Sequence, residues 1–276
     1  MTDVAGNSAL TSFETKWAAV RPEFERGLKF VAERERRAQS AFTCLVFELE
    51  RVFAIREVEP ATIKLQWWAD EFVQAGKGGA RHPLTRALAA HSRYAAVPLA
   101  HWYEVVAGAL AQRAPSPAAD RAALIDGHAA LYRPLAAIEA TLFPALDAAA
   151  ATSVRSLAHA LRDTAALGDA LRDGRLPLPL DLLAKHRLAR GDLAIPAPPQ
   201  VAILREWLLV LASDFSVAAA AAHARGGALH AAAASADRWR ARMAGRAADP
   251  LLTLNASFAL LPMRATWAAW RAGQRS

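Results

Sequence analysis

The chain has 276 residues, of which 54% are hydrophobic and 21% charged, and its formal net charge is +7 at pH 7. A chain of this length buries about 75% of its unfolded surface on folding, which is enough for one large core. No Ser-, Gly- or Pro-rich linker divides it, so we expect a single domain over residues 1–276, with residues 1–10 as a flexible N-terminus. The single cysteine, Cys44, excludes a disulfide framework.

The sequence carries no clear signal for secretion or membrane insertion. Its first residues contain no basic region followed by an apolar block. No charge-free apolar segment reaches the ~18 residues that a spanning helix needs, because Asp214 interrupts the apolar run at residues 207–222. We therefore expect a cytoplasmic protein whose contacts with membranes, if it makes them, are peripheral.

The positive charge does not predict a nucleic-acid partner. It is mostly arginine, spread along the predicted helices and interleaved with acidic residues, as is typical of solvated helix faces. The best candidate for an anion-facing stripe consists of Arg238, Arg240, Arg242 and Arg246. No nucleic-acid-binding motif accompanies this group, so a solvated face is the simpler interpretation.

In chain order, the first predicted helix begins at a capping box formed by Thr11 and Glu14, runs through Trp17 and is interrupted by Pro22. A long amphipathic run follows at residues 23–56, with a possible break near Ser40.

The next predicted helix is the one around which we expect the others to pack. Pro60 suits its first turn and glycines end its pattern; its apolar stripe consists of Leu65, Trp68, Phe72 and Ala75. Two adjacent tryptophans on neighbouring faces predict a central helix that is packed on more than one side. The Gly-Lys-Gly-Gly segment at residues 76–79 lacks the strand of a phosphate-binding loop and predicts a turn between helices, the second of which starts at His82.

The remaining chain also reads as helical. Ser116 is the expected cap of a helix that Pro134 and Pro144 bend or divide, Gly174 suits a left-handed helix end, and the prolines at 177 and 179 make residues 176–180 irregular. The further predicted helices cover residues 82–96, 98–112, 117–150, 151–173, 181–186, 201–226, 229–245 and 250–273, with a Pro-rich connection at 194–199. No alternating strand pattern is visible. We expect an all-α bundle of about ten helices.

Three segments in this order carry a resemblance to a known family. They are IKLQWWADEF, then a glycine turn with HPLTRAL, and downstream GRLPLPLDLLAKHRL. Over residues 33–192 the sequence resembles the squalene/phytoene synthase family. The resemblance implies the all-α class I isoprenoid synthase fold. It also implies an activity, the head-to-head joining of two prenyl diphosphates in isoprenoid biosynthesis, with Mg²⁺ as cofactor if the chain is active.

The first metal cluster that the resemblance implies is not present. Ionising an allylic diphosphate requires Mg²⁺ to neutralise the leaving pyrophosphate, and the family holds it with facing D-x-x-x-D pairs. The aligned positions of the first pair are Val52 and Arg56, which carry no carboxylate. Glu48 and Glu50 are close by, but residues two apart lie on different faces of a helix and make a poor metal clamp.

The second cluster is displaced. Its aligned positions are Leu167 and Leu171, whereas Asp169 and Asp173 form an i,i+4 carboxylate pair two positions later. That shift turns the pair by about 200° on a helix with about 100° per residue. Together with Arg172 and Arg175, the pair is either a solvated helix end or a displaced site.

We assign no catalytic residue and no metal ligand from the sequence. The candidate ligand-binding residues are Glu48, Lys64, Trp68, Asp169, Arg172, Asp173 and Arg175. The eight histidines show no metal-ligand spacing and are interpreted as surface or core residues. Asp70 and Glu71 are expected to face outward; alternatively, one of them pairs with an arginine across the cavity.

Three functions remain open. The favoured one is a non-catalytic or catalytically divergent family member that binds an isoprenoid or lipid, or acts on a protein partner as an assembly factor. The L-Q-W-W segment and the missing aspartates resemble the branch that contains a mitochondrial respiratory complex I assembly factor. The first alternative is an active prenyl-diphosphate transferase. The second is a helical module whose C-terminal helix contacts a membrane surface or a partner through Arg264, Trp267, Trp270 and Arg271.

Overall fold

The computed structural model describes residues 2–55, 57–112 and 116–274. Within these residues the structure has fourteen α-helices, two short 3₁₀-helices and one π-helical turn, without a β-strand, so the all-α prediction is confirmed. The number of helices exceeds the predicted ten because several long runs are divided by turns. In the described ranges, none of the helices combines the length and the apolar character needed to cross a membrane.

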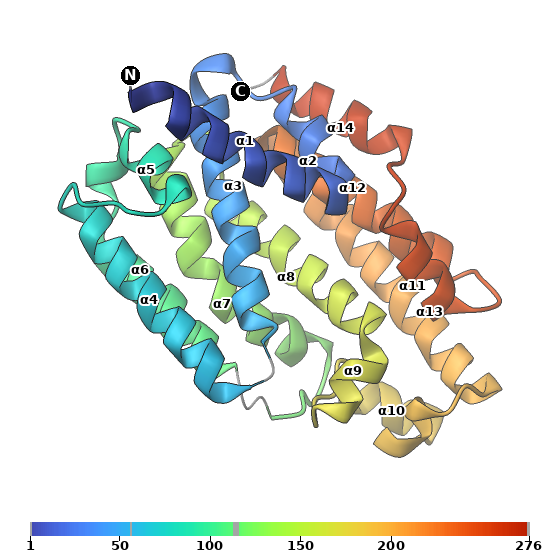
Figure 1. Cartoon of the computed structure of the whole chain (residues 1–276). Helices are drawn as coiled ribbons and strands as arrows, with labels where there is room; N and C mark the ends of the chain where they lie inside the picture. Colours follow the sequence, from blue (N-terminus) through green and yellow to red (C-terminus); the bar gives the residue numbers. More distant parts are fainter. Residues whose placement is uncertain (1, 56, 113–115, 275–276) are drawn as a thin grey trace.

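The first half of the chain forms seven α-helices (Figure 1). They are α1 (Thr2–Val20), α2 (Pro22–Leu28), α3 (Glu33–Phe53), α4 (Val58–Gly76), α5 (Pro83–Ala89), α6 (Leu99–Ala111) and α7 (Arg121–Leu142), with the 3₁₀-helix η1 (Tyr94–Ala96) between α5 and α6.

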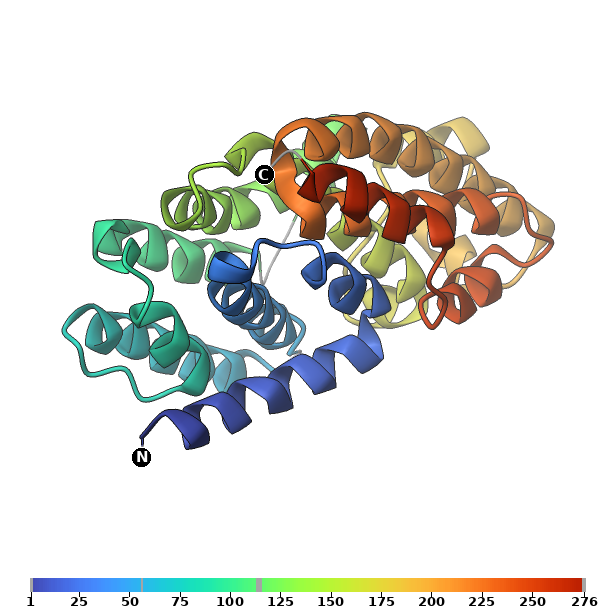
Figure 2. The same ribbon diagram turned by 90° about the horizontal axis from the view of Figure 1, so that it is seen from above.

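The second half forms the other seven. They are α8 (Ala148–Ala165), α9 (Leu167–Arg172), α10 (Leu180–His186), α11 (Pro198–Ala221), α12 (Gly227–Ala244), α13 (Pro250–Ser257) and α14 (Met263–Gly273), with η2 (Arg190–Ala194) and the π-turn η3 (Ala222–Gly226) on either side of α11. Helices α4 and α6 lie at one edge of the bundle, α11, α13 and α14 at the other, and α3 and α8 between them (Figures 1 and 2).

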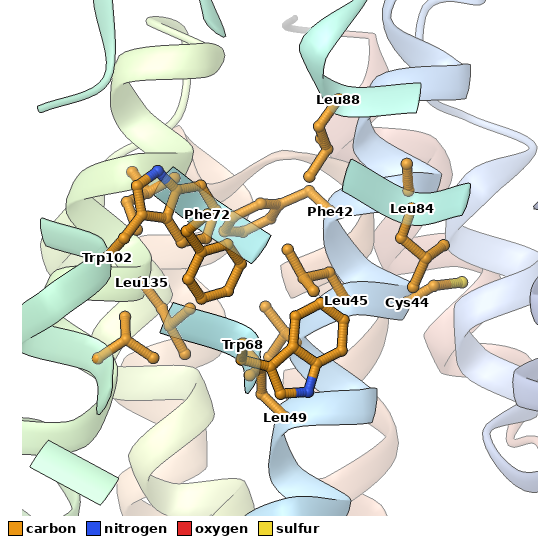
Figure 3. Close-up of a cluster of buried hydrophobic side chains, with 14 of the residues drawn as sticks. Phe42, Cys44, Leu45, Leu49, Trp68, Phe72, Leu84, Leu88, Trp102 and Leu135 are labelled. Carbon is orange, nitrogen blue, oxygen red and sulfur yellow. The ribbon is translucent and has the colours of Figure 1, made fainter. Parts of the chain in front are cut away.

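Two apolar cores stabilise this bundle. The first is built from α1 to α7, and Figure 3 shows its centre, where Leu45 and Leu49 of α3 lie beside Trp68 and Phe72 of α4. The Phe72 ring stacks on Trp102 of α6 with ring centroids 4.2 Å apart. The second core is built mainly from α8, α11 and α12. Burial of these side chains is the main favourable term in folding.

Helix α4 confirms the predicted apolar stripe but is not central. Leu65, Trp68, Phe72 and Ala75 are all buried, whereas the side chain of Trp67 is 40% exposed. Adjacent residues of a helix point about 100° apart, and α4 has neighbours on one side only, so the second indole leaves the core. The turn after α4 has the predicted glycine conformation, with φ of +80° at Gly78.

The N-terminal predictions require correction. Helix α1 begins at Thr2, so Thr11 lies inside the helix and not at its start. The flexibility expected of residues 1–10 stays a prediction. Leu10 is buried in the first core, which gives this end of the helix a packing partner. Glu14 is not part of a capping box: its carboxylate accepts a hydrogen bond from Ser40 of α3. Ser40 is therefore inside α3, and the break predicted there lies at residues 29–32.

The boundaries in the middle of the chain are also set by side chains other than those predicted. Asp120, not Ser116, caps α7 by accepting from the backbone N–H of Ala123 at 2.8 Å. Asp147 caps α8 in the same way, so Pro144 lies between two helices while Pro134 lies inside α7. Gly174 has φ of +79° and ends its helix as predicted. Residues 250–273 form two helices instead of one.

Candidate functional site

A group of partly buried charged side chains lies between the two apolar cores, and Glu50 of α3 is its centre. One carboxylate oxygen of Glu50 accepts from Nη2 of Arg162 at 2.8 Å and from the hydroxyl of Tyr132 at 2.7 Å. The other oxygen accepts from Nη2 of Arg21 at 2.5 Å. The carboxylate thus joins the turn after α1 to α7 and α8. We call the polar centre the set Arg21, Glu50, His128, Tyr132, His159, Arg162, Asp163 and Arg175.

The polar centre continues along α8 toward α9. Nδ1 of His159 lies 3.0 Å from the Tyr132 hydroxyl oxygen, and its Nε2 lies 3.6 Å from Oδ2 of Asp163. Nη1 of Arg175 lies 3.4 Å from both oxygens of Asp163. His128 of α7 stacks on His159 with ring centroids 4.4 Å apart. One chain of polar contacts therefore runs from Glu50 to Arg175.

The electrostatics of Glu50 follow from burial and its ion pairs. Burial on its own would raise the pKa of Glu50, but the positive charges of Arg162 and Arg21 and the Tyr132 hydrogen bond outweigh it and lower the pKa to about 2. Glu50 is therefore ionised at neutral pH. Burial also raises the pKa of Tyr132 well above its usual value, an effect that the neighbouring Glu50 charge strengthens.

The two histidines of the polar centre are kept neutral by their surroundings. Burial, and secondarily the neighbouring His159, lowers the pKa of His128 to about 3. Burial likewise lowers the pKa of His159, although the Asp163 charge opposes the shift. Burial would raise the pKa of Asp163, but His159 and Arg175 lower it overall. The result is an ionised carboxylate beside two neutral imidazoles.

A second polar group lies nearby between α7, α8 and α12. Glu139 forms an ion pair with Arg155 at 2.9 Å, and Nε2 of His230 lies 2.9 Å from the same carboxylate oxygen. Burial would raise the pKa of Glu139, yet the positive charge of Arg155 and the contact with His230 lower it to about 2. This group joins α7, α8 and α12 to one another, and its Arg155 and His230 line the same cavity as Glu50.

The interior has little free space around these charges. A cavity of about 60 Å³ remains between α2, α3, α8 and α12, and its wall includes Arg21, Glu50, Arg155, Arg162 and His230. This is room for about two water molecules, which take about 30 Å³ each in the liquid. Binding sites for organic ligands usually measure about 300–1,000 Å³. Among the residues that the structure describes, this cavity as folded does not accommodate a prenyl chain.

The structure separates the residues proposed from the sequence. Glu48 faces α1, where it accepts from Nε1 of Trp17 at 3.0 Å and pairs with Lys16. Glu48 and Glu50 therefore point to different neighbours, as their spacing predicted. Lys64 is exposed on α4, and Trp68 is buried among the apolar side chains of the first core.

The predicted carboxylate pair after α8 lies at an exposed helix end. Asp169 pairs with Arg172 on the surface of α9, and Asp173 lies 3.9 Å from Arg175. Arg175 is the one predicted residue that reaches the polar centre, through Asp163. The leucines at the aligned positions, Leu167 and Leu171, pack in the second apolar core. Val52 is buried in the first core, and Arg56 lies outside the described residues.

The prediction that Glu71 faces outward is wrong. Its side chain is fully buried and accepts from the backbone N–H groups of Arg81 and His82 at 2.8 Å each, and from the Thr85 hydroxyl at 2.5 Å. Burial would raise the pKa of Glu71, but these hydrogen bonds lower it overall. Glu71 therefore fixes the turn between α4 and α5, while its neighbour Asp70 is exposed.

The arginines proposed as one anion-facing stripe divide between two environments. Arg240 is buried and pairs with Glu23 and Asp237 at 2.7 Å each. Arg242 is exposed on α12, and Arg246 is exposed in the turn that follows this helix. The four arginines therefore do not form one continuous surface.

Sequence reasoning missed most of the polar centre. One signal was present: His159 and Asp163 are four residues apart, so on a helix they share a face. The histidines do not show the H-E-x-x-H or a comparable spacing, and this pair of one histidine and one aspartate is a weaker signal than such a motif. Arg21, Glu50 and Tyr132 carry no such local signal, since they meet through tertiary packing alone.

The polar centre does not fit the Mg²⁺ that the family uses. Mg²⁺ needs carboxylate oxygens that are open to coordination, together with water and substrate phosphate. Here Glu50 is engaged by two guanidinium groups, and Asp163 is flanked by two imidazoles and Arg175. The geometry therefore supports no Mg²⁺-dependent step at these residues.

Comparison with known proteins supports the architecture. Searched by sequence, no protein-family model and no curated protein matches the chain. Among solved structures, a dehydrosqualene synthase in complex with a ligand gives a TM-score of 0.67 at 11% identity, covering 92% of this chain and 96% of that one. The chain has the fold of the squalene and dehydrosqualene synthases.

A second structure supports the same conclusion. The squalene synthase HpnC from Alicyclobacillus acidocaldarius gives a TM-score of 0.64 at 14% identity, covering 92% of this chain and 94% of that one. The isoprenoid-synthase-like bundle implied by the sequence resemblance is thus confirmed. At these identities the likeness concerns the fold.

Proposed function

We propose that this chain is a non-catalytic or catalytically divergent protein with the squalene/phytoene synthase fold. It binds an isoprenoid or lipid, or acts as an assembly factor for a protein partner, without ionising an allylic diphosphate. The observation that carries the proposal is the state of Glu50, whose two oxygens accept hydrogen bonds from Arg21, Arg162 and Tyr132.

Charge balance supports this proposal. A carboxylate that pairs with two partly buried guanidinium groups has little remaining charge to offer a metal ion. Removing it from these partners would leave two partly buried positive charges uncompensated, which costs at most about 3–5 kcal/mol, the value for a fully buried pair. The polar centre therefore stabilises the packing of α3 against α7 and α8.

The volume of the interior supports it as well. The cavity of about 60 Å³ is too small for two prenyl chains, so a bound lipid would have to separate helices or bind at the surface. A ligand that binds the folded state raises its melting temperature according to its concentration and dissociation constant.

Thermal shift tests the ligand-binding form of the proposal. Farnesyl diphosphate, farnesol and phospholipid are added separately, each with and without Mg²⁺. A rise in Tm that does not require Mg²⁺, without release of pyrophosphate, supports a ligand-binding role. Absence of a shift with all three ligands would remove that role and leave the assembly factor. Steady release of pyrophosphate would contradict both and favour the alternative, an active transferase.

A surface groove favours a second candidate function, the contact with a membrane surface. The groove lies between α12 and α14 and measures about 530 Å³; its lining consists of Trp239, Arg242, Arg246, Pro262, Met263 and Arg264. Met263, Trp267 and Trp270 share one face of α14 and are 88%, 57% and 46% exposed.

The chemistry of this surface suits an anionic lipid layer. The arginines can bind the phosphate headgroups of such lipids, and the exposed indoles beside them can insert among the acyl chains. Arg271 lies 4.5 Å over the Trp267 ring, and α14 contains no acidic residue that would repel an anionic surface. We infer that α14 is the face through which the chain would contact such a membrane.

A further inference from the structure

His128, His159 and Asp163 bring three potential metal ligands together at the α7 side of the polar centre. One ligand atom from each residue lies within 4.8 Å of the other two. His159 and Asp163 are one turn apart on α8, and His128 approaches from α7. Among the residues that the structure describes, this is the group of three or more such side chains close enough to share an ion.

Hydrogen bonding fixes the tautomer of His159. The Tyr132 hydroxyl has one hydrogen, which it donates to Glu50 over 2.7 Å. Toward His159, which is 3.0 Å away, the hydroxyl can therefore only accept, so Nδ1 of His159 carries a hydrogen and donates it. In a neutral ring the other nitrogen, Nε2, is then an acceptor.

This tautomer places two acceptors opposite each other. Nε2 of His159 lies 3.6 Å from Oδ2 of Asp163, and an ionised carboxylate has no hydrogen to donate. A metal ion between the two atoms would relieve this repulsion, because it accepts a lone pair from each of them.

His128 provides the second, independent observation. Its Nε2 is buried and has no hydrogen-bond partner. A buried polar atom without a partner costs about 1–3 kcal/mol, and such atoms are rare in native proteins. The ring stacks on His159 at an interplanar angle of 22°, so the two imidazoles lie face to face.

We propose that His128, His159 and Asp163 bind one divalent transition-metal ion of the zinc type. Two imidazoles and one carboxylate suit Zn²⁺ or a neighbouring first-row ion, whereas Mg²⁺ prefers oxygen ligands. Zn²⁺ bonds of about 2.0–2.1 Å place ligand atoms about 3.4 Å apart in a tetrahedron. The pair His159 and Asp163 lies close to this spacing at 3.6 Å, whereas the His128 ring would have to turn out of its stack on His159 to bind the same ion.

The surroundings determine how the site would be completed. Tyr132 orients His159 through Nδ1, as outer hydrogen-bond partners of metal ligands do. Arg175 shares Asp163, and Arg162 is neutralised by Glu50, so the local positive charge is partly balanced. Three protein ligands leave a fourth position for water or an anion. This inference does not depend on whether the chain binds a prenyl ligand.

Zinc titration of the chelator-treated full chain against a chromophoric competitor tests the site. We expect one Zn²⁺ per chain and a Zn²⁺-dependent rise in Tm. Each of His128→Asn, His159→Asn and Asp163→Asn should weaken binding by about 100-fold or more, and Tyr132→Phe by about 10–100-fold. His101→Asn is the matched control, because His101 pairs with Glu104 at 3.0 Å on the surface and should change nothing.

Co²⁺ substitution of the wild-type chain keeps the proposal testable if a variant does not fold. Tetrahedral Co²⁺ with nitrogen and oxygen ligands should give intense visible absorption at one equivalent. Absence of that absorption together with absence of Zn²⁺ stabilisation would overturn the site. Binding that survives all three ligand variants, or that is lost in His101→Asn, would overturn it equally.

Discussion

The guanidinium of Arg162 donates a hydrogen bond to Glu50 over 2.8 Å, although 112 positions of the sequence separate the two residues. The contact joins α3 to α8 between the two apolar cores. Because Arg21 and Tyr132 reach the same carboxylate, one acidic side chain links four segments of the chain.

Replacing Glu50 with glutamine should therefore destabilise the protein strongly. The substitution keeps the size of the side chain but leaves Arg21 and Arg162 as partly buried charges without the Glu50 counterion. We expect a loss of up to about 3–5 kcal/mol in the free energy of unfolding, measured by urea denaturation at pH 7. Glu48→Gln is the matched control two residues away, and its half-exposed pair with Lys16 should contribute about 1 kcal/mol or less. Equal losses of unfolding free energy in the two variants would show that Glu50 has no special role in stabilising the helix packing.

Glu71 and Asp70 offer a second matched pair. Glu71→Ala leaves the backbone N–H groups of Arg81 and His82 without their acceptor, so we expect a loss of about 2–6 kcal/mol. Asp70→Ala changes an exposed neighbour and should stay within about 0.5 kcal/mol. Thermal unfolding of both variants measures the difference. If Glu71→Ala unfolds at the same temperature as the wild-type chain, the α4–α5 turn is held by other contacts.

Glu139 gives a pH dependence with a defined sign. Its pKa is about 2 in the folded chain and 4.5 ordinarily, so the folded state favours the ionised form. The resulting stabilisation, on the order of 3 kcal/mol, is complete above about pH 4.5 and is lost as the pH falls through about 2. The Tm difference between wild type and Glu139→Gln should thus be large at pH 7 and shrink below pH 4.5. A constant difference from pH 7 to pH 3 would show that the charge of Glu139 is not responsible.

The C-terminal surface predicts a lipid-dependent effect of two tryptophans. Co-sedimentation with vesicles of anionic phospholipid should fall at least ~10-fold in Trp267→Ala/Trp270→Ala, since burial of the two indoles is worth more than ~1.4 kcal/mol. Binding should also weaken with added salt, because screening reduces the attraction of the arginines. Trp67→Ala, which removes a half-exposed indole at the opposite edge, is the control. Loss of binding in that control instead would place the contact on α4.

The sequence predicted the fold well because helical periodicity is a local property. The stripe of Leu65, Trp68 and Phe72 and the glycine end at Gly174 follow from spacing and backbone preference alone. Several boundaries were misplaced because competing caps, such as Ser116 and Asp120, have the same local chemistry. Packing of the remaining chain decides between them.

The polar centre was largely unpredictable for a physical reason. A buried acid such as Glu50 or Glu71 looks like a surface acid in the sequence, because its partners come from distant helices. The rotation of each helix about its own axis decides which carboxylates face the interior. Asp169 faces solvent, while Asp163, six residues earlier, faces inward. His159 and Asp163 are the exception, because their separation by four residues places both on one face of a helix and is visible in the sequence.

Release of pyrophosphate from farnesyl diphosphate in the presence of Mg²⁺ tests the central claim most directly. The purified chain and its Asp163→Asn variant are compared with a reaction that contains no protein. Because Glu50 is engaged by Arg21 and Arg162, we predict release at the background rate in both. Steady turnover by the wild-type chain that Asp163→Asn abolishes would contradict the account and identify the polar centre as an active site.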